Sequence, residues 1–500
     1  MTDNLRMTYS GQAALARLLF AVAVLALPLS EVRADPGPQV APASSSNANS
    51  GPTSAALPAL MPAVPSATVD NAARHTLPLE ALGHLTLEVE LINDPDFPEV
   101  TREAATAILD QARRTLADKL SFGTLDFEVK EVMSVAEFMA RNVGVDDACV
   151  KEFEPLRVRP GTRRAAAVDP KLVNRFLSQW SVESLASYFP ETERAALTSY
   201  EVIADKLLAE FDRKVATVAG FKLKSGASLL APDKLDQRSY VNWICALRNQ
   251  DDADLILTNE LVLYDLASEP YPHSIFAKCK VGGASLASPK RQAIYRRAMF
   301  ASTFSMVTDL EFFQEDGAAS LSAGDKLAVI GTFIVAHELG HAVFKLPDFY
   351  DHPPECLMTT KFETGYVSGY REILSHPGPC PLCQPWVDAK RHVFLAEAAH
   401  HDGKYEAAID HLRAAIKGTP KHVDGNYRRY IADLSVMVAD NFISLGKTKE
   451  ALQWVQAALR IVPDHQEALA IQSRHPANPA PLPASSPAVP STSAPPNPSP

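Results

Sequence analysis

Apolar and polar residues alternate along two short stretches, residues 85–92 (LTLEVELI) and 125–132 (LDFEVKEV). Such alternation is typical of β-strands with one buried face. Between them, residues 101–120 carry Ala and Leu at the three- and four-residue steps of an amphipathic helix. The order strand, helix, strand predicts the start of an α/β sheet.

The pattern changes after this unit. Residues 150–235 predict mainly helices and contain no assignable motif, whereas residues 253–265 and 274–288 return to strand character. We therefore predict an α+β domain over residues 76–385 that carries a helical insertion at 150–235. A chain of 500 residues is too long for one core, so a second folded unit is expected.

The second unit is indicated by an internal repeat. Residues 403–420 and 446–463 both begin with Gly-Lys, both end with Pro, and carry Ala at matching positions. The pattern resembles tetratricopeptide helical hairpins, although the usual repeat of ~34 residues would need an insertion. It implies an all-α region at residues 386–475, with either a purely structural role or a surface that binds a protein partner.

Composition limits the partners and the ordered part of the chain. The net charge of −11 argues against nucleic acid, since phosphate binding needs clustered Lys and Arg. Residues 35–75 and 476–500 are rich in Pro, Ala and Ser and almost free of charged and aromatic residues. Such segments bury too little apolar surface to fold, so both are predicted to be disordered.

The N-terminus has the three parts of a secretory signal. Arg6 and Arg17 precede an apolar run at residues 18–29, and Val32-Arg33-Ala34 follows as a cleavage site. As a helix, this run would rise only ~18 Å, which is too short for a hydrocarbon core of ~30 Å. We expect residues 1–34 to be removed, leaving a bacterial periplasmic or extracellular protein without a membrane span.

The most informative stretch is GTFIVAHELGHAVFKLPDFYDHPPECLMTT, residues 331–360. Ser322 and Asp325 predict a helix start, and apolar residues then recur at helical steps through His337 and His341. Residues at i and i+4 lie ~6 Å apart on one face, so two imidazoles can share a Zn²⁺ ion. Glu338, rotated by about 100°, could reach a water molecule without binding the ion.

The segment HELGHAVFKLPDFYD followed by ECLM resembles the metzincin clan of zinc metallopeptidases, in particular the snapalysin-like and immune-inhibitor-A-like branches. The resemblance implies a twisted mixed sheet over an active-site helix. It also implies one catalytic zinc ion, held by His337, His341 and Asp348. Glu338 would be the general base, and Met358 would form a turn beneath the metal.

The sequence departs from that pattern where the helix should end. Phe344 and Lys345 stand in place of the clan's glycine, and one extra residue precedes Asp348. Lys345 can adopt the positive φ of such a helix end only at a cost of ~1 kcal/mol. The third ligand therefore has alternatives, which are His352, Asp351, Glu363 and Glu372.

The six cysteines have two interpretations. In an oxidising compartment an even number favours disulfides, which predicts Cys356 bonded to Cys380 or Cys383, and Cys245 bonded to Cys279. The last three cysteines also resemble those of archaemetzincins, where they build a structural zinc site. Phe349 occupies the place of that site's first cysteine, and we therefore favour disulfides.

These features lead to one principal function and two alternatives. The principal one is an exported zinc endopeptidase acting on peptides or proteins, with Glu338 activating water and Tyr366 or Tyr370 stabilising the oxyanion. The wall of its specificity pocket is expected after Met358. The alternatives are a catalytically degenerate zincin that binds partners through its helical repeats, and a zinc amidase acting on cell-wall substrates.

Overall fold

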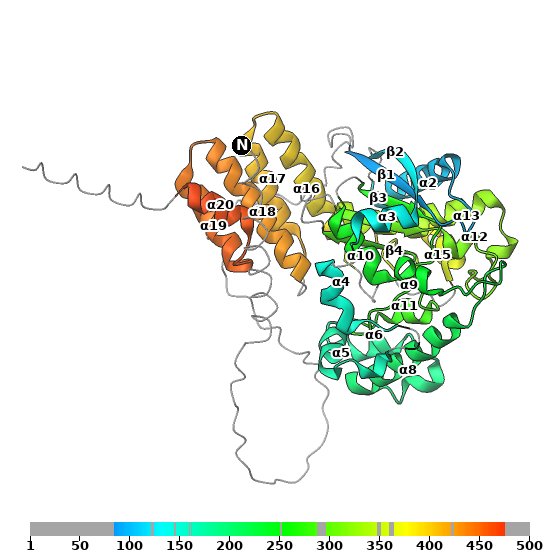
Figure 1. The fold of residues 1–500 in the computed structure, drawn as a ribbon. Helices are drawn as coiled ribbons and strands as arrows, with labels where there is room; N and C mark the ends of the chain where they lie inside the picture. The colour runs from blue at the N-terminus through cyan, green and yellow to red at the C-terminus, as the bar shows by residue number, and fades with distance from the viewer. Residues whose placement is uncertain are drawn as a thin grey trace, which may run out of the picture. The chain divides into compact units, whose positions relative to one another are not determined.

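The structure is a computed structural model that describes residues 85–475, apart from 122–124, 145–146, 160, 162, 251–252, 288–296, 348–351, 360–364 and 422–424. The predicted signal peptide and both predicted disordered segments lie outside the described residues. Within them, the protein has a mixed α/β domain followed by a helical C-terminal region, as the sequence predicts (Figure 1).

The chain begins with the predicted strand–helix–strand unit. Strand β1 (Leu85–Asn93) and strand β2 (Leu125–Ser134) pair in parallel, joined by helix α2 (Arg102–Leu120). The side chain of Thr101 caps α2 by accepting a hydrogen bond from the amide of Ala104, at 3.2 Å. This part of the prediction is confirmed.

Five strands form one mixed sheet in the described part of the chain, in the order β2-β1-β3-β5-β4. Strands β3 (Leu255–Thr258) and β5 (Arg297–Ser302) continue the parallel arrangement, whereas β4 (Gly283–Ala287) runs antiparallel to β5 at the edge. The sequence pattern did not indicate β5. Strand character was also expected throughout residues 274–288, but helix α11 (Pro272–Phe276) occupies the start of that stretch.

Alternation along the central strands divides the core between the two faces of the sheet. Leu255 and Leu257 face the cluster that contains α2 and the candidate metal-binding helix, whereas Ile256 faces the cluster formed with the helical insertion. Because all three side chains are fully buried, β3 is covered on both faces. The sheet therefore holds the candidate helix against one face and the insertion against the other.

The predicted insertion is helical throughout its described part. Helices α8 (Tyr200–Ala219) and α10 (Tyr240–Asn249) pack with the shorter helices in a core that they share with one face of the sheet. The shorter helices are α3 (Val135–Asn142), α4 (Ala148–Phe153), α5 (Pro170–Leu177), α6 (Val182–Ala186), α7 (Glu191–Arg194) and α9 (Pro232–Arg238).

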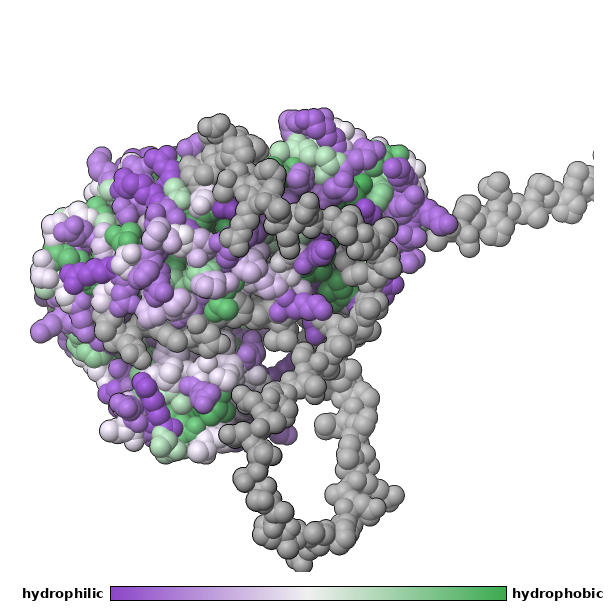
Figure 2. All heavy atoms as spheres, turned by 180° about the vertical axis from the view of Figure 1, so that it is seen from behind, coloured by the Kyte–Doolittle hydropathy of each residue, from purple (hydrophilic) through white to green (hydrophobic). Residues whose placement is uncertain are grey.

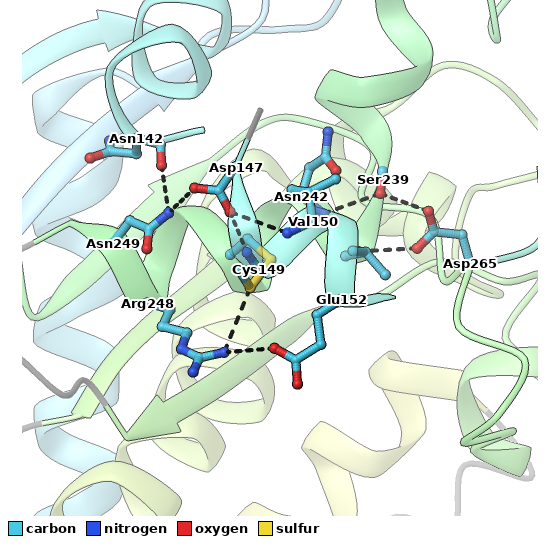
Figure 3. Close-up of a disulfide and its surroundings, with 12 residues drawn as sticks. Asn142, Asp147, Cys149, Val150, Glu152, Ser239, Asn242, Arg248, Asn249 and Asp265 are labelled. Atoms are coloured by element: carbon cyan, nitrogen blue, oxygen red, sulfur yellow. Dashed lines mark hydrogen bonds and ion pairs between the residues drawn. A yellow bond between two sulfur atoms is a disulfide. The ribbon is translucent and has the colours of Figure 1, made fainter. Parts of the chain in front are cut away.

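A disulfide between Cys149 and Cys245 joins α4 to α10, with their Cα atoms 5.7 Å apart (Figure 3). Beside it, Asp147 caps α4 and accepts a hydrogen bond from Asn249 at 2.8 Å. The predicted pairing of Cys245 with Cys279 is therefore wrong. Cys279 is buried near charged residues of α8 and forms no disulfide, and Cys245 is already bonded to Cys149.

A cluster of largely buried ion pairs joins α9 to the residues that follow β1 and β3. Arg238 is fully buried and donates to Glu260 and Asp96, each at 3.0 Å, while Lys234 lies 2.8 Å from Asp94. Three carboxylates thus face two cations. Burial raises the pKa of Glu260 well above its usual value, against the attraction of Arg238. Retention of a proton by Glu260 would balance the charges of the cluster.

We predict that Arg238→Met lowers the free energy of unfolding by about 3–5 kcal/mol, because it leaves buried carboxylates without their cation. Urea unfolding of the full chain measures this change. The control is Arg213→Met, which breaks an ion pair with Glu210 whose arginine side chain is 62% exposed, and should cost no more than about 1 kcal/mol. Equal effects of the two substitutions would contradict the assignment.

The C-terminal region repeats one helical hairpin. Gly403 and Gly446 have φ angles of 72° and 71°, and the amides of Lys404 and Lys447 each bond to a carbonyl five residues earlier, at 2.8 Å. The same helix ending thus recurs at the predicted offset. The extra length of the repeat lies in the 20 residues of α18 (Gly425–Ser444). The remaining helices are α16 (Gln384–His401), α17 (Tyr405–Gly418), α19 (Thr448–Ile461) and α20 (Gln466–Arg474).

Apolar surface is dispersed over the visible face in Figure 2, where polar residues surround small hydrophobic patches. Among the described residues, one helical stretch, Ala323–Phe344, is long and apolar enough to cross a membrane. That stretch is 78% buried within the fold. Its apolar character is therefore accounted for by the core.

Candidate metal centres

The predicted histidine helix is built from three segments. Helix α13 (Ala323–Val329) continues through a π-helical segment, Ile330–Val335 (η5), into α14 (Ala336–Phe344). Ser322 accepts a hydrogen bond from the amide of Asp325 at 3.1 Å, which confirms the predicted start. The π segment was not predicted, because the spacing of apolar residues indicates a regular helix of 3.6 residues per turn. Single π turns are frequent at functional sites.

His337 and His341 direct their rings toward each other. Their Nε2 atoms lie 3.1 Å apart. The Nδ1 atom of His337 lies 2.9 Å from the carbonyl oxygen of Leu357, and that of His341 lies 2.6 Å from the carbonyl oxygen of Leu346. Since a carbonyl can only accept, each Nδ1 carries the proton. In neutral rings of this tautomer, the two Nε2 lone pairs would converge.

Converging lone pairs repel one another unless a cation lies between them. Two Zn–N bonds of ~2.1 Å at a tetrahedral angle place their nitrogen atoms ~3.4 Å apart. The observed 3.1 Å separation of the Nε2 atoms is close to this value. Donation of the other ring N–H to a backbone carbonyl is also the usual outer contact of a metal-binding histidine. The histidine pair therefore fits a metal ion.

Glu338 lies between α14 and the edge strand. Its side chain is 6% exposed and packs against Gly283, the first residue of β4. A Cβ atom on Gly283 would come within 2.7 Å of the Glu338 Oε1 atom. Glycine at this position thus lets the carboxylate lie directly beside the strand backbone.

Of the residues predicted as a third ligand, the structure describes only His352 and Glu372. Asp348, Asp351 and Glu363 lie outside the described residues. Glu372 is exposed on helix α15 (Gly365–Ser375). His352 is buried, and its ring contacts cysteines rather than the histidine pair.

The chain leaves α14 through a left-handed residue although no glycine is present. Lys345 has φ 58° and ψ 27°, and the amide of Leu346 bonds to the carbonyl oxygen of Gly340 at 3.2 Å. The Nζ group of Lys345 donates to the carbonyl oxygen of Ala342 at 2.9 Å. Lys345 thus adopts the left-handed conformation in place of a glycine, at a backbone cost of about 1–2 kcal/mol.

Glycine at position 340 lets another side chain approach the backbone of the histidine helix closely. A Cβ atom there would lie 2.5 Å from the Sδ atom of Met358, so the thioether rests on the helix backbone. Met358 is fully buried. The structure thus places Met358 beneath the helix that carries both histidines.

A second group of possible ligands lies below this helix. His352, Cys356, Cys380 and Cys383 are all buried, and their ligand atoms lie within 4.8 Å of one another. The Nδ1 atom of His352 is 3.2, 3.3 and 3.8 Å from the sulfur atoms of Cys380, Cys356 and Cys383, and the last two sulfurs are 3.6 Å apart. Tetrahedral Zn–S bonds of ~2.3 Å would separate the sulfurs by ~3.8 Å. The group could hold a metal ion.

The predicted disulfide from Cys356 to Cys380 or Cys383 is therefore wrong, since these cysteines form no disulfide. The three sulfur atoms and the ring of His352 surround one point. Hydrogen bonds within the group lower the pKa of the Cys380 thiol and raise the pKa values of Cys356 and Cys383, so that Cys380 is the thiolate that the other two stabilise. The chain accordingly has two possible metal sites, where one ion was predicted.

The sequence contained a signal for this group. Cys380 and Cys383 have the C-x-x-C spacing common in zinc sites, and His352 precedes Cys356 by four positions. We favoured disulfides because an exported protein usually oxidises its cysteines. His352 was considered only for the catalytic site, so the fourth ligand was missed.

The two sites share a backbone segment. Leu357, whose carbonyl oxygen accepts from His337, lies between Cys356 and Met358. The Nε2 atom of His352 lies 3.4 Å from the carbonyl oxygen of Pro347, next to Leu346. A metal ion held by the cysteine group would therefore stabilise the segment that orients both histidines.

The two predicted tyrosines are in different surroundings. Tyr366 stacks on Phe333, with ring centroids 5.0 Å apart, and its hydroxyl lies against Gly282. Burial raises the pKa of Tyr366, and the nearby carboxylates of Glu315 and Glu338 add to this effect. The pKa of Tyr370 is raised by burial and by the carboxylate of Asp325, which lies in α13. Only Tyr366 is near Glu338.

Comparisons with known proteins identify no relative. No protein-family model, curated protein or solved structure matches the chain. The functional interpretation therefore depends on the geometry of the two sites and on the five-stranded sheet that positions them.

We predict that His352→Ala and Cys383→Ser each remove one bound metal ion per chain and lower the thermal midpoint of unfolding, because each deletes a ligand of the cysteine group. Mass spectrometric metal analysis of the purified full chain measures the content. Cys279→Ser is the matched control, because this buried cysteine lies outside the group, and it should leave the metal content unchanged. Unchanged content in all three variants would contradict the site.

Proposed function

We propose that the chain is an exported zinc-dependent endopeptidase, with His337 and His341 as metal ligands and Glu338 as general base. The observation that supports this proposal is the 3.1 Å separation of the two Nε2 atoms on a helix that also carries the buried Glu338. When bound there, zinc would supply a Lewis acid that acidifies water and polarises a peptide carbonyl.

Glu338 is suited to moving protons in this site. It follows His337 directly on the helix and lies against β4, so its carboxylate can reach a water molecule held between helix and strand. The carboxylate would accept the proton of that water and deliver it to the amine that leaves. Burial keeps the phenol of Tyr366 protonated, and its hydroxyl would donate a hydrogen bond to the reacting carbonyl.

The edge strand offers a place for an extended substrate. Among the described strands, β4 pairs only with β5, so its other edge carries backbone groups that could bind a peptide as an added strand. Because Gly283 lies against Glu338, a peptide on this edge would place its backbone beside the general base. This arrangement supports peptides, rather than small amides, as the substrate class.

The second site suits a structural zinc ion. Three cysteines and one histidine, all buried, make a closed tetrahedral set, which is typical of structural zinc rather than catalytic zinc. The disulfide between Cys149 and Cys245 supports an oxidising compartment. In such a compartment, bound zinc would protect the three thiolates from oxidation.

We predict that Glu338→Gln lowers peptide hydrolysis by ~10²–10⁴-fold, because the proton acceptor is lost. Casein cleavage by the mature chain measures the loss, and metal content should equal that of the wild type. The control, Glu311→Gln, changes an exposed glutamate and should leave cleavage unchanged. Full activity of Glu338→Gln would show that another group is the base.

Asp348→Ala should remove the histidine-bound ion while the cysteine-bound ion remains, because Asp348 is the third ligand implied by the sequence. Metal analysis after gel filtration reports the stoichiometry. Asp351→Ala is the matched control, because this aspartate lies three residues from Asp348 in the same segment. If Asp351→Ala alone loses the ion, the third ligand is Asp351 instead.

A further inference from the structure

Lys119, near the C-terminal end of α2, is a buried cation without a carboxylate partner in the described part of the chain. It is 1% exposed. Its Nζ group donates to two backbone carbonyl oxygens, that of Glu355 at 3.3 Å and that of His376. The neighbouring Asp118 is exposed, so water screens its charge. Burying an ammonium group is costly unless an opposite charge lies nearby.

Two other buried cations of this protein have such a partner. The guanidinium group of Arg157 lies 3.0 Å from the carboxylate of Asp265. That of Arg238 lies 3.0 Å from the carboxylate of Glu260. Both acidic residues are themselves buried. The fold thus pairs these cations with buried anions, which raises the question of what balances the charge of Lys119.

The cysteine group supplies a negative charge when it holds a metal ion. Three thiolates and one neutral imidazole around a divalent ion leave one net negative charge at the centre. Glu355, whose carbonyl oxygen accepts from Lys119, immediately precedes Cys356. Burial lowers the pKa of Lys119, whereas the negative charges of Asp118 and Cys356 raise it. The ammonium group therefore lies close enough to the group to interact with its charge.

Lys119 also joins the two chain segments that supply the cysteines. The carbonyl group of Glu355 belongs to the segment that contains Cys356. The carbonyl group of His376 belongs to the other segment, four residues before Cys380. One side chain of α2 thus holds the two segments side by side, as their shared centre requires. A neutral hydrogen-bond donor could do the same, so the effect of the charge has to be tested separately.

The end of α2 makes further contacts with the second segment and with the helix that follows it. The amide of Gly378 donates to the carbonyl oxygen of Asp118 at 3.1 Å. Arg391 of α16 donates to the carbonyl oxygen of Leu120 at 3.4 Å. Both bonds use carbonyl groups of the last helical turn, which have no partner within the helix. The residues on either side of Lys119 are therefore fixed against the chain that carries the cysteines.

We propose that Lys119 is the buried counter-cation of the metal-loaded cysteine group and that its charge strengthens metal binding. This inference rests on the structural metal site of the proposed function. Lys119 is a positioning residue and not a ligand, because its ammonium group has no lone pair to donate. It connects α2, in the opening strand–helix–strand unit, to the segment whose Leu357 carbonyl orients His337.

The test measures metal binding by the demetallated mature chain with the three thiols reduced. Cobalt(II) bound by thiolates gives an intense near-ultraviolet charge-transfer band. The histidine pair has no thiolate, so this band reports the cysteine group alone. Lys119→Met should bind Co²⁺ and, by competition, Zn²⁺ about 10–100-fold more weakly than the wild type. Lys171→Met, which removes an exposed cation from α5, should bind both ions as the wild type does.

Two further variants separate the charge from the hydrogen bonds. Lys119→Arg keeps the positive charge, whereas Lys119→Gln keeps a hydrogen-bond donor without the charge. The arginine variant should therefore bind Zn²⁺ more tightly than the glutamine variant. This comparison decides the proposal where Lys119→Met does not fold. Equal binding by the arginine and glutamine variants would overturn the role of the charge.

Thermal unfolding distinguishes a counter-cation from a purely structural lysine. Lys119→Met should lower the unfolding midpoint of the zinc-loaded chain and leave that of the zinc-free chain unchanged or higher, because only the loaded group carries the balancing charge. Equal lowering of both midpoints, or wild-type affinity in Lys119→Met, would overturn the proposal while leaving the metal site standing. Absence of the charge-transfer band from the wild type would overturn the metal site and the role of Lys119 together.

Discussion

Two hydrogen bonds from imidazole N–H groups to backbone carbonyls determine the chemistry available to this protein. By bonding to Leu357 and Leu346, the Nδ1 atoms of His337 and His341 orient the two rings so that their Nε2 atoms face each other. Without those carbonyls, either ring could rotate or change tautomer, and the lone pairs would no longer converge. The segment after the helix is therefore as important as the helix itself.

That segment is held at several points. The left-handed conformation of Lys345 turns the chain back, Met358 packs against Gly340, and the cysteine group that includes His352 lies between them. Each contact limits the movement of the two carbonyls. Closure of the cysteine group by a metal ion would make the whole return segment rigid, which links a structural site to the orientation of a catalytic one.

Much of this arrangement could be predicted because it depends on local periodicity. The strand–helix–strand start follows from the periodicity of each of its elements. The spacing within one helix also places His337 and His341 on a shared face, and glycine at position 340 is a sign of a close contact. The missed features depend on distant residues. Strand β5 is a short apolar run whose identity comes from its neighbours β3 and β4, and the π segment adapts the helix to α2. His352 joins Cys380 and Cys383, which are 28 and 31 positions away, a proximity that only the folded chain creates.

The central claim is that a metal ion lies between His337 and His341. Anomalous diffraction from crystals of the mature chain, recorded on both sides of the zinc absorption edge, tests it directly. The account predicts a zinc peak ~2.1 Å from the Nε2 atoms of both histidines. The absence of an anomalous peak between the two rings in zinc-supplemented crystals, with their Nε2 atoms still at hydrogen-bonding distance, would contradict it.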